Sequence, residues 1–206
     1  AYDVSDNVNV YFSVGTGYKS TSWNLSRDAR PFAANQAAHE AAGLTQINQS
    51  YGTLYAGPEE ATVFEFGLKA RFEQGAINIA VFDQEIKGFQ DNTFIGTGFV
   101  LGNAGTQSTR GVELEATWVP NENLEFRYAG TYLDPVYDEY LNSTRGDISG
   151  TRPAGIPEIS MSTSATVYFE PADEMTGYAR FDWQYESEVV VVGGLAPMRE
   201  VSTINA

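Results

Sequence analysis

The sequence has no cysteine and a single histidine, His39, among its 206 residues. Without cysteine the chain forms neither a disulfide framework nor a thiolate metal site. One histidine leaves almost nothing for imidazole ligation or for a nucleophile–base pair. The residues around it, 31–43, are rich in alanine and could form a short helix that ends at Gly43. We therefore expect His39 to be a surface residue of a long loop, and not a ligand or a base.

Basic residues and long apolar runs are also scarce. Twelve Lys and Arg stand against 27 Asp and Glu, for a net charge of −15, which excludes nucleic acid as a partner. No window approaches the roughly 18 apolar residues of a membrane helix. No basic, apolar and small-residue signal segment begins at Ala1, so we expect that a leader was removed or that the chain begins within a larger protein. Hydropathy alone would suggest a soluble protein, but a membrane barrel gives only a weak hydropathy signal per strand.

Aromatic residues and glycine are abundant, with twelve Tyr, twelve Phe and twenty Gly, which favours strands and turns. Six segments alternate with a period of two, and in each the apolar face carries no charge. These segments are residues 8–18, 62–73, 111–118, 124–132, 159–169 and 178–185. A seventh strand, residues 76–89, is less regular, and an eighth could begin at residues 201–206.

The strand at residues 76–89, which comes third along the chain, is irregular. Ile77, Ile79 and Val81 begin an apolar face, but its continuation would carry Asp83 and Glu85. We predict a bulge near Phe82 that shifts the register and turns these carboxylates to the other face.

The connections between strands alternate in length. Residues 73–75, 120–123 and 170–175 are short turns, whereas 20–61, 90–109, 133–158 and the stretch after Glu186 are long. Such parity is typical of a membrane barrel with short periplasmic turns and long extracellular loops. A soluble sandwich gives no reason for it, and long unstructured loops are uncommon in compact domains.

Aromatic residues fall near both predicted strand ends, where a membrane barrel has its aromatic girdles. Phe72, Trp118, Phe126 and Phe169 lie at the short-turn side, and Tyr18, Phe64, Tyr132 and Tyr185 at the other. We therefore predict an all-β fold, a portion of an antiparallel up-and-down transmembrane β-barrel.

The charged residues of the strands form the candidate site. Facing them to lipid would cost about 2–4 kcal/mol for each Lys or Arg at the bilayer midplane, so we expect them to face the lumen. There they would either solvate the lumen and pair across strands or line a substrate path. The lumen-facing candidates are Glu65, Lys69, Arg71, Glu113, Glu115, Arg127, Arg180 and Asp182.

No catalytic, cofactor or metal site is expected. The serines form neither a nucleophile elbow nor a serine–histidine constellation. Residues 96–98, Gly-Thr-Gly, lack a following helix and indicate a loop hinge. Asp134, Asp138 and Glu139 could offer oxygen ligands to Ca²⁺, but their spacing fits no calcium loop and indicates a solvated acidic loop. We expect a protein that is not an enzyme.

Five segments together resemble the barrel of TonB-dependent receptors in order and spacing. They are 17–24 (GYKSTSWN), 58–69 (PEEATVFEFGLK), 78–83 (NIAVFD), 103–115 (NAGTQSTRGVELE) and 155–158 (GIPE). The resemblance implies seven to eight strands of a barrel of about 22 strands, with the plug domain and the last strand or strands outside residues 1–206. It also implies the bacterial outer membrane and its lipid, partnership with the plug and TonB, and active import of a scarce nutrient. A siderophore–iron complex, cobalamin and an oligosaccharide all fit.

Two other classes remain open. A complete outer-membrane barrel of about eight strands would serve a structural or adhesive role, and a stop directly after Ala206 would favour it. A soluble all-β module that binds, for example, carbohydrate would purify without detergent. An outer-membrane enzyme is more distant.

Overall fold

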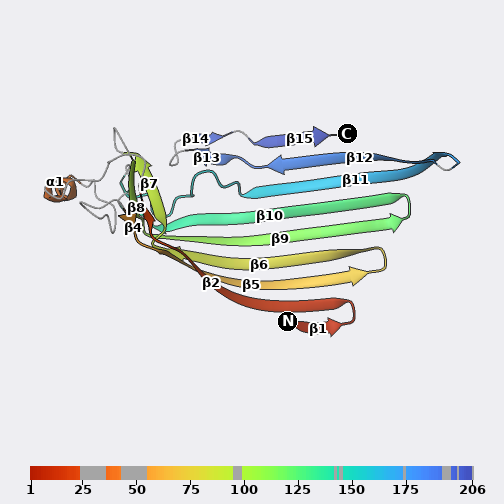
Figure 1. Cartoon of the computed structure of the whole chain (residues 1–206), viewed down its shortest axis with the longest axis horizontal. Helices are drawn as coiled ribbons and strands as arrows, with labels where there is room; N and C mark the ends of the chain where they lie inside the picture. Colours follow the sequence, from red (N-terminus) through yellow and green to blue (C-terminus); the bar gives the residue numbers. More distant parts are fainter. Residues whose placement is uncertain are drawn as a thin grey trace.

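The computed structural model describes residues 1–23, 36–42, 55–94, 99–141, 143, 146–173, 175–191, 196–198 and 200–205. Nine strands form one antiparallel sheet in which each strand pairs with the next strand of the sheet along the chain (Figure 1). They are β1 (Tyr2–Ser5), β2 (Val8–Lys19), β5 (Glu59–Phe72), β6 (Gly75–Lys87), β9 (Thr106–Asn121), β10 (Leu124–Glu139), β11 (Ile159–Ala172), β12 (Met175–Glu186) and β15 (Val201–Asn205).

The sheet is a single open layer. Strands β1 and β15 form its two edges and do not pair with each other, which does not fit a small closed barrel (Figure 1). In the described part of the chain no large side chain is fully buried, and Phe12 and Phe66 are 61% and 50% exposed. A soluble sandwich would cover these rings with a second sheet. An uncovered apolar face is what the lipid-facing wall of a barrel requires.

All seven predicted strands are confirmed, and the eighth is β15. The six regular strands are longer than predicted: β9 and β10, for example, have 16 residues each, whereas about 9–11 suffice to cross a bilayer. The first residues form a strand that was not predicted, because Tyr2–Ser5 is β1 and pairs with β2.

The parity of the connections also holds. The described tight turns, at residues 6–7, 73–74 and 122–123, lie at one end of the sheet, which we call the short-turn end. The opposite, long-loop end carries small hairpins that the sequence did not predict: β3 (Ser22–Trp23) with β4 (Tyr55–Ala56), β7 (Gln90–Phe94) with β8 (Phe99–Asn103), and β13 (Val189–Val191) with β14 (Ala196–Met198).

Helix α1 (Gln36–Ala41) confirms a short helix within residues 31–43. Its predicted end at Gly43 and the predicted hinge at 96–98 lie outside the described residues. No helix in the described ranges has the length and apolarity needed to cross a membrane.

The predicted bulge near Phe82 is wrong. Strand β6 pairs with β5 and with β9 without a register shift from Gly75 to Lys87. Asp83 and Glu85 therefore share a face with Val81, and they form ion pairs of 2.9 Å there with Arg110 and Lys87, respectively. The alternation is not broken. The strand simply continues past its apolar rows into a charged zone at the long-loop end.

Aromatic rings that lie over glycines fix the register. Tyr11 is paired with Gly67 across β2 and β5, and Phe82 with Gly111 across β6 and β9. A Cβ atom at Gly67 would lie 2.2 Å from the Tyr11 ring, and one at Gly111 would lie 2.3 Å from the Phe82 ring. A one-residue slip would bring a side chain under each ring, so these pairs oppose it.

The continuous register of β6 predicts which cysteine pairs can form a disulfide. Asp83 and Arg110 are direct partners, so the double variant D83C/R110C should oxidise readily in the folded parent protein. The control D83C/T109C places the second thiol on the opposite face and should stay reduced. Because these residues include no native cysteine, any native thiols elsewhere in the parent protein are first removed and free-thiol titration then reads the result. If the control oxidised efficiently while the D83C/R110C pair stayed reduced, the result would contradict the continuous register and support a bulge near Phe82.

Candidate functional site: the polar face of the sheet

The polar face is the face opposite the exposed apolar rows. The register places all eight candidate residues on it: Glu65, Lys69 and Arg71 on β5, Glu113 and Glu115 on β9, Arg127 on β10, and Arg180 and Asp182 on β12. Alternation along each strand causes this, because residues two apart point the same way. That this face lines a lumen stays a prediction.

One group of these residues lies across β2 and β5. The Tyr11 hydroxyl donates a hydrogen bond of 2.6 Å to Glu65 Oε1, and Lys69 Nζ lies 5.4 Å from the centroid of the Tyr11 ring. Tyr11 thus contacts one negative side chain, Glu65, and one positive side chain, Lys69. Arg71 and Glu113 make no side-chain hydrogen bond or ion pair with another described residue.

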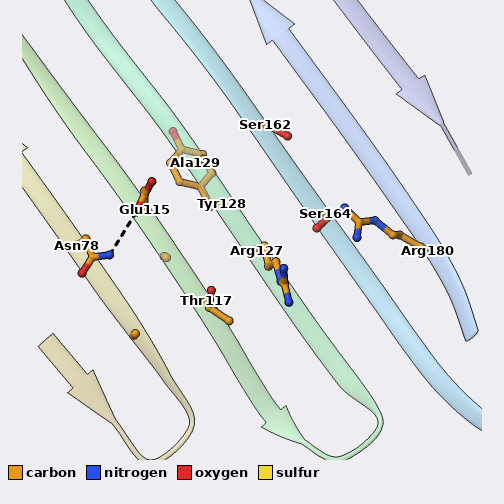
Figure 2. Close-up of a pocket in the computed structure, with 11 residues that line it drawn as sticks. Asn78, Glu115, Thr117, Arg127, Tyr128, Ala129, Ser162, Ser164 and Arg180 are labelled. Carbon is orange, nitrogen blue, oxygen red and sulfur yellow. Dashed lines mark hydrogen bonds between the residues drawn. The ribbon is translucent and has the colours of Figure 1, made fainter. Parts of the chain in front are cut away.

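A second group surrounds a shallow cavity of about 310 Å³ between β6 and β12 (Figure 2). Asn78 Nδ2 donates to Glu115 at 3.2 Å along one side. Arg180 holds Asp182 through two nitrogens, at 2.7 and 2.9 Å. The bottom of the cavity lies close to the backbone of β11, because that strand contributes only the short side chains of Ser162 and Ser164 to the lining.

The basic groups of this cavity are neutralised locally. Arg127 pairs with Glu125, as Arg180 does with Asp182, and each partner lies two residues away on the same strand. Glu125 also accepts a hydrogen bond of 3.1 Å from the Tyr168 hydroxyl. The result is a polar wall of paired charges that can contact a polar surface and holds no free strong nucleophile or base among its described residues.

The list of candidates omitted several residues that the structure brings to the polar face: Tyr11, Asn78, Glu125 and Tyr168. Glu125 could have been found, because Arg127 lies two residues away on the same strand and therefore on the same face. Tyr11 and Asn78 depend on cross-strand register, which the sequence alone did not give.

The three acidic residues weighed as calcium ligands do not gather. Asp134 is paired in register with Arg110, and Asp138 accepts a hydrogen bond of 2.9 Å from Ser108. The register of β10 shifts between Tyr137 and Glu139, and Glu139 is paired with Thr106 on β9. Within the ranges that the structure describes, no three His, Cys, Asp or Glu side chains are placed to hold a metal ion.

Substitution of Gly67 tests the geometry around Tyr11. In the variant Gly67→Ala the new methyl group displaces the ring and breaks its bond to Glu65, so we expect the free energy of unfolding to fall by about 1–3 kcal/mol. The matched control, Gly15→Ala, adds a methyl group with nothing within 4 Å and should change stability little. Denaturant unfolding of the detergent-solubilised parent protein measures both. Equal costs for Gly67→Ala with and without Tyr11→Ala would contradict the geometry, since removing the ring should relieve the clash.

Comparisons with known proteins agree on the fold. The family model described as "TonB dependent receptor-like, beta-barrel" matches residues 1–196. Similar solved structures include the ferric yersiniabactin uptake receptor FyuA from Yersinia pestis (17% identity, 98% of this chain and 27% of that chain, TM-score 0.72). They also include BauA, the ferric preacinetobactin receptor from Acinetobacter baumannii (16%, 98% and 27%, 0.68), and the copper transporter OprC (15%, 98% and 29%, 0.64).

A comparison with curated protein sequences finds no match. The chain spans between a quarter and a third of each solved structure named above, so it corresponds to part of a barrel. The open nine-stranded sheet agrees with this. The chain belongs to the TonB-dependent receptor β-barrel family.

Proposed function

We propose that the parent protein is an energy-coupled transporter of the bacterial outer membrane and that these residues form part of its barrel wall. The observation that carries the proposal is the two-sided sheet: one face is apolar and uncovered, and the other carries charged side chains, among them the ion pairs of Arg127 with Glu125 and of Arg180 with Asp182. Only a sheet with lipid on one side and an aqueous interior on the other suits both faces. The family match supports the same assignment.

In this proposal the short-turn end faces the periplasm and the long-loop end faces the outside. Stacked aromatic residues support a membrane interface at the short-turn end, where the Trp118 and Phe126 ring centroids lie 5.4 Å apart. From Phe72 to Phe64 the apolar face of β5 extends about 27 Å along the strand, or about 20 Å along the barrel axis at a tilt of about 35–45°, which covers most of an apolar band about 25 Å tall.

The proposed partners follow from this orientation. The polar face would meet the plug domain of the parent protein, and TonB would act through an N-terminal segment outside these residues. The long-loop end, where the small two-stranded sheets and α1 lie, would contribute to ligand capture (Figure 1). Energy would come from the proton-motive force of the inner membrane.

For the substrate we rank a ferric siderophore first. Two of the similar structures are named as receptors for ferric yersiniabactin and ferric preacinetobactin, another as the siderophore receptor PiuA from Acinetobacter baumannii, and one as a copper transporter. Cobalamin and oligosaccharides belong to the same test, because no chemistry of the described residues selects among them.

An uptake assay tests the proposal. Cells with and without the parent gene receive radiolabelled catecholate, hydroxamate and phenolate ferric siderophores, cobalamin, and an oligosaccharide. We expect gene-dependent accumulation of one of these probes that stops when a protonophore collapses the proton-motive force. Gene-dependent uptake that survives the protonophore, or no gene-dependent uptake of any probe, would argue against energy-coupled transport.

A further inference from the structure

A buried asparagine, Asn103, joins separate loops at the long-loop end of the sheet. Its side-chain Oδ1 accepts a hydrogen bond from the backbone N–H of Gly57 at 2.7 Å. Its Nδ2 donates to the carbonyls of Gly57 and Gly88, at 3.0 and 2.6 Å. Asn103 is only 7% exposed, so these bonds are shielded from water. One side chain thus connects the end of β8 to the segment before β5 and to the turn after β6.

The two residues that follow fit the same junction. Ala104 is 1% exposed, and its N–H donates to the Phe89 carbonyl at 2.8 Å. Gly105 lies against β10 so closely that a Cβ atom there would be 1.9 Å from the Glu139 carbonyl oxygen. The sequence Asn103–Ala104–Gly105 therefore supplies one bonding side chain, one small buried side chain and one position with no room for a side chain.

A second tie reaches β2. Glu59 accepts hydrogen bonds from the backbone N–H of Gln90 and from Lys19 Nζ, the latter at 3.3 Å. Gln90 Nε2 donates to the carbonyls of Ser20 and Gly57, at 2.9 and 2.8 Å. These bonds join the end of β2, the start of β5 and the start of β7 next to Asn103.

A third tie is aromatic and reaches β10. The Phe89 ring stacks on Tyr137 at 5.3 Å and meets Tyr140 edge-on at 5.4 Å. Tyr140 is 4% exposed and donates to the Asp91 carboxylate. The Phe89 carbonyl accepts a hydrogen bond from the N–H of Ala104, the residue after Asn103. The aromatic cluster is therefore linked to Asn103 through this bond and the backbone.

We propose that Asn103 is a positioning residue that holds the roots of three loops as one preassembled unit: residues 19–23 with 55–59, residues 88–94 with 99–105, and residues 137–141 with 146–149. Loss of its amide removes this buried partner from the Gly57 N–H and the Gly88 carbonyl, while the Gly57 carbonyl keeps only Gln90 Nε2, and the roots then open independently. A preassembled rim captures ligand without the entropic cost of ordering loops. This last consequence rests on the proposed function, whereas the coupling itself does not.

Hydrogen exchange on the full parent protein in detergent tests the coupling without any ligand. In Asn103→Ala we expect exchange to accelerate by about tenfold or more at residues 57–59 and 88–92 and also at the remote residues 137–151, with the central parts of β5 and β9 unchanged. The matched control is Asn78→Ala, whose amide donates to one side chain on the polar face, and it should leave the loop roots unchanged. Acceleration confined to residues near 57 and 88 would overturn the proposal.

A disulfide in place of the amide separates tethering from general damage. A Cβ atom at Gly57 would lie 4.0 Å from Asn103 Cγ, so the thiols of G57C/N103C would face each other and need only a small backbone adjustment to form a disulfide, in a chain with no other cysteine among these residues. The oxidised pair should protect residues 137–151 as the native protein does, and its reduction should release them. Protection lost in both states would overturn the proposal. The uptake assay can fail without changing either result.

In that assay, Asn103→Ala should raise the half-saturating probe concentration by about tenfold at an unchanged amount of surface receptor. A fall in maximal rate alone would contradict a positioning role.

Discussion

In the apolar interior of a membrane, every backbone N–H and C=O must find its partner within the protein. The seven inner strands of the sheet meet this requirement by pairing with a neighbour on either side, as in the thirteen consecutive pairs of β6 with β5. Once the backbone is satisfied in this way, the side chains need not form a core. This explains why the described residues bury no large side chain completely while Phe12 and Phe66 stay open on the apolar face.

The same pairing assigns each strand two different surfaces. Side chains two residues apart share a face, so Arg127 with Glu125 and Arg180 with Asp182 neutralise each other on the polar side without reaching across the sheet. At the long-loop end, beyond the apolar rows, the two faces no longer differ in polarity, and the ion pair of Asp83 with Arg110 lies on the same face as the apolar rows. There the chain departs from the sheet, and buried side chains such as Asn103 and Tyr140 replace strand pairing as the means of holding segments together.

Period-two alternation and the parity of the connections predicted the seven main strands, because both depend only on local sequence. The facing of β6 was not predictable in the same way. Alternation gives the face of Asp83 but not its height along the barrel axis, so a carboxylate beyond the apolar rows looked like a register error. Strand β1, with four residues, was too short to show a period. The Tyr11–Glu65 bond and the Asn103 junction join residues 54 and 46 positions apart, and they depend on the register and on the meeting of several segments.

Spin-label accessibility along β9 tests the two-sided wall most directly. Labels are placed one at a time from Val112 to Thr117 in the parent protein, reconstituted in a lipid bilayer. Val112, Leu114 and Ala116 should be relaxed by oxygen dissolved in the lipid. Glu113, Glu115 and Thr117 should be shielded from that oxygen and should be relaxed by a water-soluble nickel complex wherever the interior is open. A uniform response along the strand, or oxygen relaxation strongest at Glu113 and Glu115, would contradict a membrane-spanning barrel wall with this facing.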